Sequence, residues 1–106
     1  MAVDLIRNSA VTVRVGPFVD ATTAVAPETG VDVATADEAE LLKANGAATV
    51  SLASHTWAAV ANADGYYDLS LTATDTNTRG ELIVAVNDDT VCRPVCMRFN
   101  VVSGAF

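Results

Sequence analysis

The only histidine of the chain directly follows a serine, at Ser54-His55. A serine beside a histidine is part of a Ser-His-Asp arrangement when the histidine can take the proton of the serine hydroxyl. Such a nucleophile needs a sharply held turn, yet residues 51–57 contain no Gly-x-Ser-x-Gly elbow. The sequence therefore predicts that His55 is an exposed loop residue and that the protein is not an enzyme.

Acidic side chains form two close pairs, Glu38/Glu40 and Asp88-Asp89. On a strand, Glu38 and Glu40 face the same side, as acid–base chemistry by two carboxylates would require. Asp88-Asp89 belongs to a polar turn, but the sequence has neither a calcium loop of the Asp-x-Asp-x-Asp-Gly type nor a glycine-rich phosphate loop. Both pairs are typical of a solvated acidic surface, so we expect no metal and no other cofactor.

The two cysteines, Cys92 and Cys96, are separated by three residues. On one continuous strand this spacing holds their Cα atoms roughly 13 Å apart, which is beyond the reach of a disulfide. Only a tight turn at Arg93-Pro94 would bring them together. Two cysteines and one histidine are also too few ligands for a structural zinc site. We therefore expect two buried, reduced thiols.

Length and charge limit the class of protein and its partners. The 106 residues have the size of one domain, and 51% of them are hydrophobic, which excludes a disordered chain. Six Lys and Arg against thirteen Asp and Glu give a net charge of −7, which disfavours nucleic acid and anionic membranes as partners. The chain has no apolar stretch of ~20 residues and no secretory signal pattern, so we expect a protein that is made in the cytoplasm.

Alternation of apolar and polar residues predicts strands along much of the chain. It runs through residues 11–15, 67–73 and 95–101. Residues 81–86 are apolar on both faces, which suits a central strand covered on both sides. The residues expected in the core are Val13, Val15, Tyr67, Leu69, Leu71, Leu82, Val84, Met97, Phe99 and Val101.

Residues 36–44 fit two interpretations. They are rich in helix formers and follow Thr35, which is a possible helix N-cap. Alternatively, they form a strand that ends in a turn at Asn45-Gly46, with residues 47–52 returning beside it. Asn-Gly is the strongest short signal for a β-hairpin, and the surrounding strand pattern favours this second interpretation.

Turn signals recur at the spacing typical of an all-β sandwich, and about seven strands fit between them. We therefore expect an immunoglobulin-like β-sandwich, with residues 1–9 as an N-terminal arm and residues 10–106 as a single β-sandwich domain. In such a fold, Trp57 is either a core anchor between the sheets or an exposed contact residue on a loop. The segment around Tyr67 partly matches a tyrosine corner, in which the hydroxyl holds the preceding loop.

Five segments of the chain, in this order, resemble a family of small β-sandwich structural proteins of tailed bacteriophages and prophages. They are residues 13–20 (VRVGPFVD), 27–31 (PETGV), 43–47 (KANGA), 64–69 (DGYYDL) and 71–78 (LTATDTNT). The resemblance covers residues 11–102 and brings no catalytic motif with it. It implies a virion protein that is made in the host cytoplasm. Its partners would be other virion proteins, namely the major capsid protein or tail proteins, and it could form a homo-oligomer on the particle.

The expected role is that of a capsid decoration (cement) protein, with a tail, neck or baseplate component as the alternative. A further alternative is a carbohydrate-binding module that uses Trp57 or Tyr66 as a stacking platform. The residues expected at the interface with a neighbour lie near the two termini, where the alternation places nothing in the core; they are Leu5, Ile6, Arg7 and Phe106. Either these termini fray, or the arm becomes ordered on a neighbouring virion protein.

Overall fold

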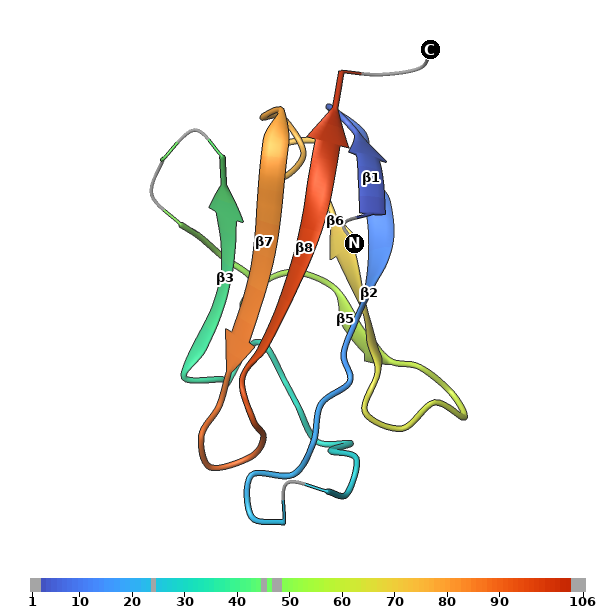
Figure 1. Cartoon of the computed structure of the whole chain (residues 1–106), viewed down its shortest axis with the longest axis vertical. Coiled ribbons are helices and arrows are strands. Elements are labelled where there is room, and N and C mark those ends of the chain that lie inside the picture. The colour runs from blue at the N-terminus through green and yellow to red at the C-terminus, as the bar shows by residue number, and fades with distance from the viewer. Residues whose placement is uncertain (1–2, 24, 45, 47–48, 104–106) are drawn as a thin grey trace.

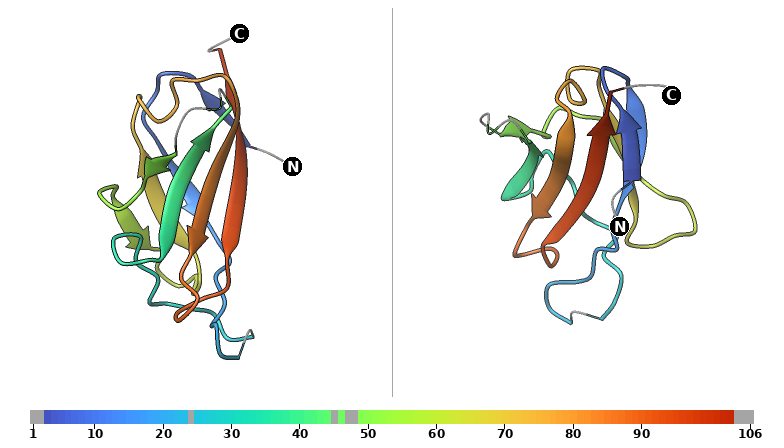
Figure 2. Two further views of the ribbon diagram at one scale, coloured as in Figure 1. Left: turned by 90° about the vertical axis from the view of Figure 1, so that its left-hand side faces the viewer. Right: turned by 45° about the horizontal axis from the view of Figure 1, so that its top comes forward.

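The computed structural model describes residues 3–23, 25–44, 46 and 49–103. The regular secondary structure of these residues consists of β-strands alone. The strands are β1 (Val3–Ile6), β2 (Val11–Val15), β3 (Glu38–Lys43), β4 (Val50–Ser51), β5 (Trp57–Ala59), β6 (Tyr67–Leu71), β7 (Gly80–Asn87) and β8 (Val95–Val102). They form a five-stranded sheet in the order β1-β8-β7-β3-β4 and a three-stranded sheet in the order β2-β6-β5. The two sheets lie face to face (Figure 1; Figure 2). The predicted all-β class is confirmed.

The core lies between the two sheets and follows from the alternation in the strands. In β6, for example, Tyr67, Leu69 and Leu71 are buried, whereas the two residues between them are half-exposed. All residues predicted for the core are buried except Met97, which is half-buried and packs against the others. Burial of these side chains is the main stabilising contribution to such a fold, at roughly 1.5–3 kcal/mol for each large apolar side chain.

Strand β7 is central, as predicted, because it pairs with β8 on one side and with β3 on the other. Its residues Leu82, Val84 and Val86 are buried between the sheets. Ile83 and Ala85 point to the opposite face and are only half-buried. The prediction that both faces of this strand are covered is therefore wrong within the part of the chain that the structure describes.

The hairpin predicted from residues 36–44 and 47–52 is confirmed by the pairing of the strands within them. Strands β3 and β4 pair antiparallel, with Leu41 opposite Val50. Ala39 and Leu41 are buried while Glu38 and Leu42 are exposed. This period of two buries apolar side chains on one face, and that burial outweighs the helix propensity of the segment. Asn45 of the predicted turn lies outside the described residues.

The N-terminal segment is part of the five-stranded sheet. Strand β1 pairs in parallel with β8, and its Leu5 lies opposite Val101. Leu5 belongs to the core, with 5% of its surface exposed. The prediction that residues 1–9 form an arm outside the core is therefore wrong for the described residues of this segment. Leu5 is the reason, because its burial between the sheets fixes the segment beside β8.

Two of the segments that carry the phage resemblance meet at one end of the sandwich. The backbone N–H of Phe18 donates to the carbonyl of Gly65 over 2.8 Å. A Cβ on Gly16 would lie 2.7 Å from that same carbonyl oxygen, and a Cβ on Gly65 would lie 2.8 Å from the carbonyl oxygen of Phe18. Both glycines also have positive φ angles, so this close approach of two backbones requires glycine on both sides.

Candidate functional site

The four residues predicted to dock on a neighbour have separate places in the structure. Leu5 is buried and cannot contact another protein without opening the core. Ile6 is 50% exposed and pairs in register with Val102, and the neighbouring Arg7 is exposed. The backbone N–H of Arg7 donates to the carbonyl of Val102 over 2.8 Å. Phe106 lies outside the described residues, so the structure leaves Ile6 and Arg7 as the accessible part of this group.

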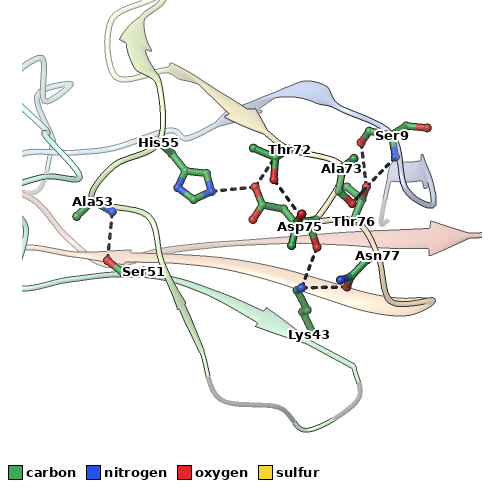
Figure 3. Close-up of polar contacts among 11 residues, drawn as sticks. Ser9, Lys43, Ser51, Ala53, His55, Thr72, Ala73, Asp75, Thr76 and Asn77 are labelled. Carbon is green, nitrogen blue, oxygen red and sulfur yellow. Dashed lines mark hydrogen bonds and ion pairs between the residues drawn. The ribbon is translucent and has the colours of Figure 1, made fainter.

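His55 is not the exposed loop residue that the sequence predicts. Its ring nitrogen Nε2 lies 2.8 Å from Oδ2 of Asp75, and the two side chains are only 11% and 5% exposed (Figure 3). The same carboxylate oxygen accepts a hydrogen bond of 2.7 Å from the backbone N–H of Thr72. Because His55 and Asp75 are 20 positions apart in the sequence, no local sequence motif predicts their contact.

A buried histidine–aspartate pair is two thirds of a catalytic triad, so its geometry matters. In a Ser-His-Asp triad the aspartate holds Nδ1 and the outer nitrogen Nε2 serves as the base. Here Nε2 is bonded to Asp75, so that Nδ1, next to the ring's attachment point, would have to be the base. A shallow pocket of about 430 Å³ beside the ring is lined by the hydroxyl-bearing residues Ser54, Thr56, Ser70 and Thr72. Among the described residues, none of these hydroxyls is hydrogen-bonded to His55.

The contacts of the β6–β7 loop indicate what the pair does instead. Lys43 of β3 donates through Nζ to the carbonyl of Thr74 and to Oδ1 of Asn77, at 2.9 and 3.0 Å. The buried hydroxyl of Thr76 donates to the carbonyl of Ser9 and accepts from its N–H. Together with His55, these groups tie one loop to three other parts of the chain (Figure 3). The arrangement is suited to holding this loop in place.

A second cluster joins the turn of the β7–β8 hairpin to the segment that precedes β3. Carboxylate oxygens of Asp37, Asp88 and Asp89 lie within 4.8 Å of one another. Oδ2 of Asp37 accepts the backbone N–H of Asp89 over 3.1 Å, and Oδ1 of the buried Asp88 accepts the hydroxyl of Thr90. Sequence reasoning found the adjacent pair but missed Asp37, which is 52 positions from Asp89. Calcium takes six to eight oxygen ligands, and each of these three side chains offers one ligand atom to the cluster.

The proximity of Asp37 raises the pKa of the Asp89 carboxyl above its ordinary 3.8, first through a hydrogen bond between the two side chains and then through repulsion. The folded protein therefore holds this proton to higher pH than the unfolded chain does. It follows that the contribution of Asp89 to stability is present at low pH and is lost as the pH rises through the raised pKa.

We expect Asp89→Asn to raise the melting temperature at neutral pH, because an amide cannot be repelled by Asp37. The gain should shrink as the pH falls through 3.8 and should disappear well below it, where the carboxyl is protonated in both states. Thermal unfolding followed by circular dichroism over this pH range measures the effect. Asp64→Asn, at an exposed loop position, is the matched control and should show a smaller change. A neutral-pH melting temperature that falls in Asp89→Asn contradicts the repulsion.

Both cysteines are free thiols, as predicted, but only Cys92 is buried. Burial raises the pKa of the Cys92 thiol above its ordinary value. Cys96 is exposed on β8, where the alternation turns it away from the core. The prediction that both thiols are buried is therefore wrong for Cys96.

Three aromatic rings form a cluster that includes Phe18, whose backbone N–H donates to Gly65. The rings of Trp57 and Tyr67 are stacked with their centroids 4.9 Å apart, and Phe18 meets both edge-on. The indole N–H of Trp57 donates to the carbonyl of Val31 over 2.9 Å. Trp57 is half-buried against the core, as expected of a core anchor. Tyr66, at 39% exposure, is the accessible aromatic of the two named for sugar stacking.

Tyr67 holds a loop, as a tyrosine corner does, but not the loop that precedes it. Its hydroxyl donates to the carbonyl of Glu28 over 2.8 Å and accepts the N–H of Val31 over 3.1 Å. Both partners belong to a segment more than 35 positions upstream. Burial raises the pKa of this hydroxyl, so it stays protonated and able to donate.

Comparison of the chain with protein-family models, with curated proteins and with solved structures finds no match in any of the three. In the part of the chain that the structure describes, there is no helix of the length and apolarity needed to cross a membrane.

Proposed function

We propose that the protein is an immunoglobulin-like β-sandwich that serves as a non-catalytic structural component of a bacteriophage virion. The strand order supports the fold type. If β2 to β8 correspond to immunoglobulin strands B, C, C′, D, E, F and G, the two sheets have the orders B-E-D and G-F-C-C′. The first strand, β1, then lies parallel to strand G.

The observation that carries the proposal of a virion protein is that the segments with the phage resemblance contact one another. Residues 13–20 meet residues 64–69 where Phe18 donates to Gly65. Residues 27–31 are held by the hydroxyl of Tyr67, through Glu28 and Val31. The close approach of the two backbones requires glycine at positions 16 and 65. The segments that carry the resemblance therefore contact one another in the folded chain, and this is the support that the proposal has.

The polar groups support a structural role for the protein. His55 and Asp75 are engaged in fixing a loop, and the pocket beside them is shallow. Within this proposal the protein is a head decoration protein, because a small rigid domain can cover a capsid surface in many copies, where weak contacts add up through avidity. The carbohydrate-binding alternative is less well supported, because the ring of Trp57 is stacked on Tyr67 and only Tyr66 of the two named aromatics is exposed.

Quantitative mass spectrometry of purified phage particles tests the proposal. We expect a copy number comparable to that of the major capsid protein. A few copies per particle would instead assign the protein to the tail, neck or baseplate and would exclude the decoration role. Absence of the protein from particles of the phage that encodes it would overturn the virion role altogether.

A further inference from the structure

The outer face of the five-stranded sheet carries an apolar surface that no other part of the described chain covers. This face is turned toward the viewer in Figure 1. Leu42 of β3 lies opposite Ile83 of β7, and Ala85 of β7 lies opposite Cys96 of β8. Leu42 is 36% exposed, Ile83 and Ala85 are half-buried, and Cys96 is exposed. We call these four residues the outer apolar patch.

The composition of β7 indicates that the outer apolar patch is covered in the working protein. Strand β7 pairs antiparallel with both of its neighbours. A strand of an antiparallel sheet with one solvated face usually alternates apolar and polar residues, whereas apolar residues on both faces are typical of sheets covered on both sides. The core covers one face of β7, through Leu82, Val84 and Val86, but Ile83 and Ala85 face outward. Single exposed apolar residues are common on protein surfaces, whereas neighbouring apolar residues with a polar rim are typical of interaction sites.

The rim of the patch is acidic, which restricts what can cover it. Arg98 is the only basic residue that β3, β7 and β8 direct to this face, and it is paired with Glu81 at 3.0 Å. Glu38 and Glu40 lie on the same face of β3. A second copy of the chain, with its net charge of −7, would bring like charges together. The rim instead complements a protein surface that carries lysine and arginine.

We propose that the outer apolar patch is the surface through which this protein docks on the virion. Its occupant is a virion protein with an apolar centre ringed by lysine and arginine. The inference rests on the proposed virion function and adds to it the docking face and the chemistry of the partner. Docking through the middle of a sheet face also leaves strand β1 in its place beside β8, unlike the docking arm expected from the sequence.

The two thiols provide a direct test in the wild-type protein. Cys96 lies in the patch, whereas Cys92, 1% exposed, serves as an internal control. In the isolated protein, a maleimide should label Cys96 and leave Cys92 unlabelled under native conditions. In intact particles, we expect the labelling of Cys96 to be lost. If the protein is present in the particle and Cys96 is labelled as fast as in the isolated protein, the docking face is wrong and the virion role stands.

A pair of lysine variants tests the chemistry of the partner. Leu42→Lys places a positive charge in the outer apolar patch, where it would face the lysine and arginine side chains expected on the partner. This variant should not be incorporated into particles. Thr12→Lys introduces a lysine at an exposed position of β2, in the other sheet, and should be incorporated normally. Circular dichroism and thermal unfolding of the isolated variants show whether both are folded. Normal incorporation of Leu42→Lys, or equal loss of both folded variants, overturns the inference; absence of the wild-type protein from particles overturns the virion role and this inference together.

Discussion

Replacement of Leu71 by alanine is expected to lower the free energy of unfolding by roughly 2–5 kcal/mol. Leu71 is 2% exposed and ends β6, the central strand of the three-stranded sheet. Its removal loses the free energy of burying the side chain, and it also leaves a cavity because the two sheets cannot close on the missing volume. The free energy of unfolding of small domains is only about 5–15 kcal/mol. The variant should therefore unfold at a much lower denaturant concentration than the wild-type protein.

Chemical denaturation followed by circular dichroism measures this loss. Leu42→Ala is the matched control, because it removes the same atoms from a leucine that is 36% exposed on the outer face of β3. We expect the control to cost much less, since less apolar surface returns to water and no closed cavity forms. Equal losses in the two variants would contradict the assignment of Leu71 to the core and of Leu42 to the surface.

Much of the fold could be predicted because the sequences of several strands show a regular alternation of apolar and polar residues. Strands β2, β6 and β8 alternate regularly, and each of them can be found without knowledge of its partner. The hairpin of β3 and β4 was predictable from Asn-Gly together with the neighbouring strands, against the helix propensity of residues 36–44. In each case the strand is predicted from neighbouring residues of the sequence, through the alternation of apolar and polar residues or through a turn motif.

The predictions that were wrong or incomplete concern contacts between residues that are far apart in the sequence. Strand β1 has four residues, too few for a periodic signal, and its partner β8 lies at the other end of the chain. The sequence of β7 is apolar on both faces, but it does not show whether the outer face is covered by another part of this chain or by another protein. His55 and Asp75 were each visible in the sequence, but only the packing of two loops brings them together. The same holds for Asp37 beside Asp89.

Replacement of Leu5 by alanine is the second variant expected to cause a large loss of stability, again roughly 2–5 kcal/mol. The sequence places Leu5 in a free arm, where its truncation would leave the unfolding free energy unchanged. The structure places it in the core with 5% exposure, next to Ile6 with 50% exposure. Ile6→Ala therefore serves as the matched control and should cost far less, because its side chain is already half in water.

Hydrogen exchange provides an independent measurement for the same strand. The N–H of Arg7 is bonded to the carbonyl of Val102, so its exchange should be slow in the wild-type protein and faster in Leu5→Ala. Stability losses that are equally small for Leu5→Ala and Ile6→Ala, together with fast exchange at Arg7, would show that the segment is not part of the sheet. Residues 3–7 would then be free to pair with a neighbouring protein, and docking through an arm would replace docking through the sheet face.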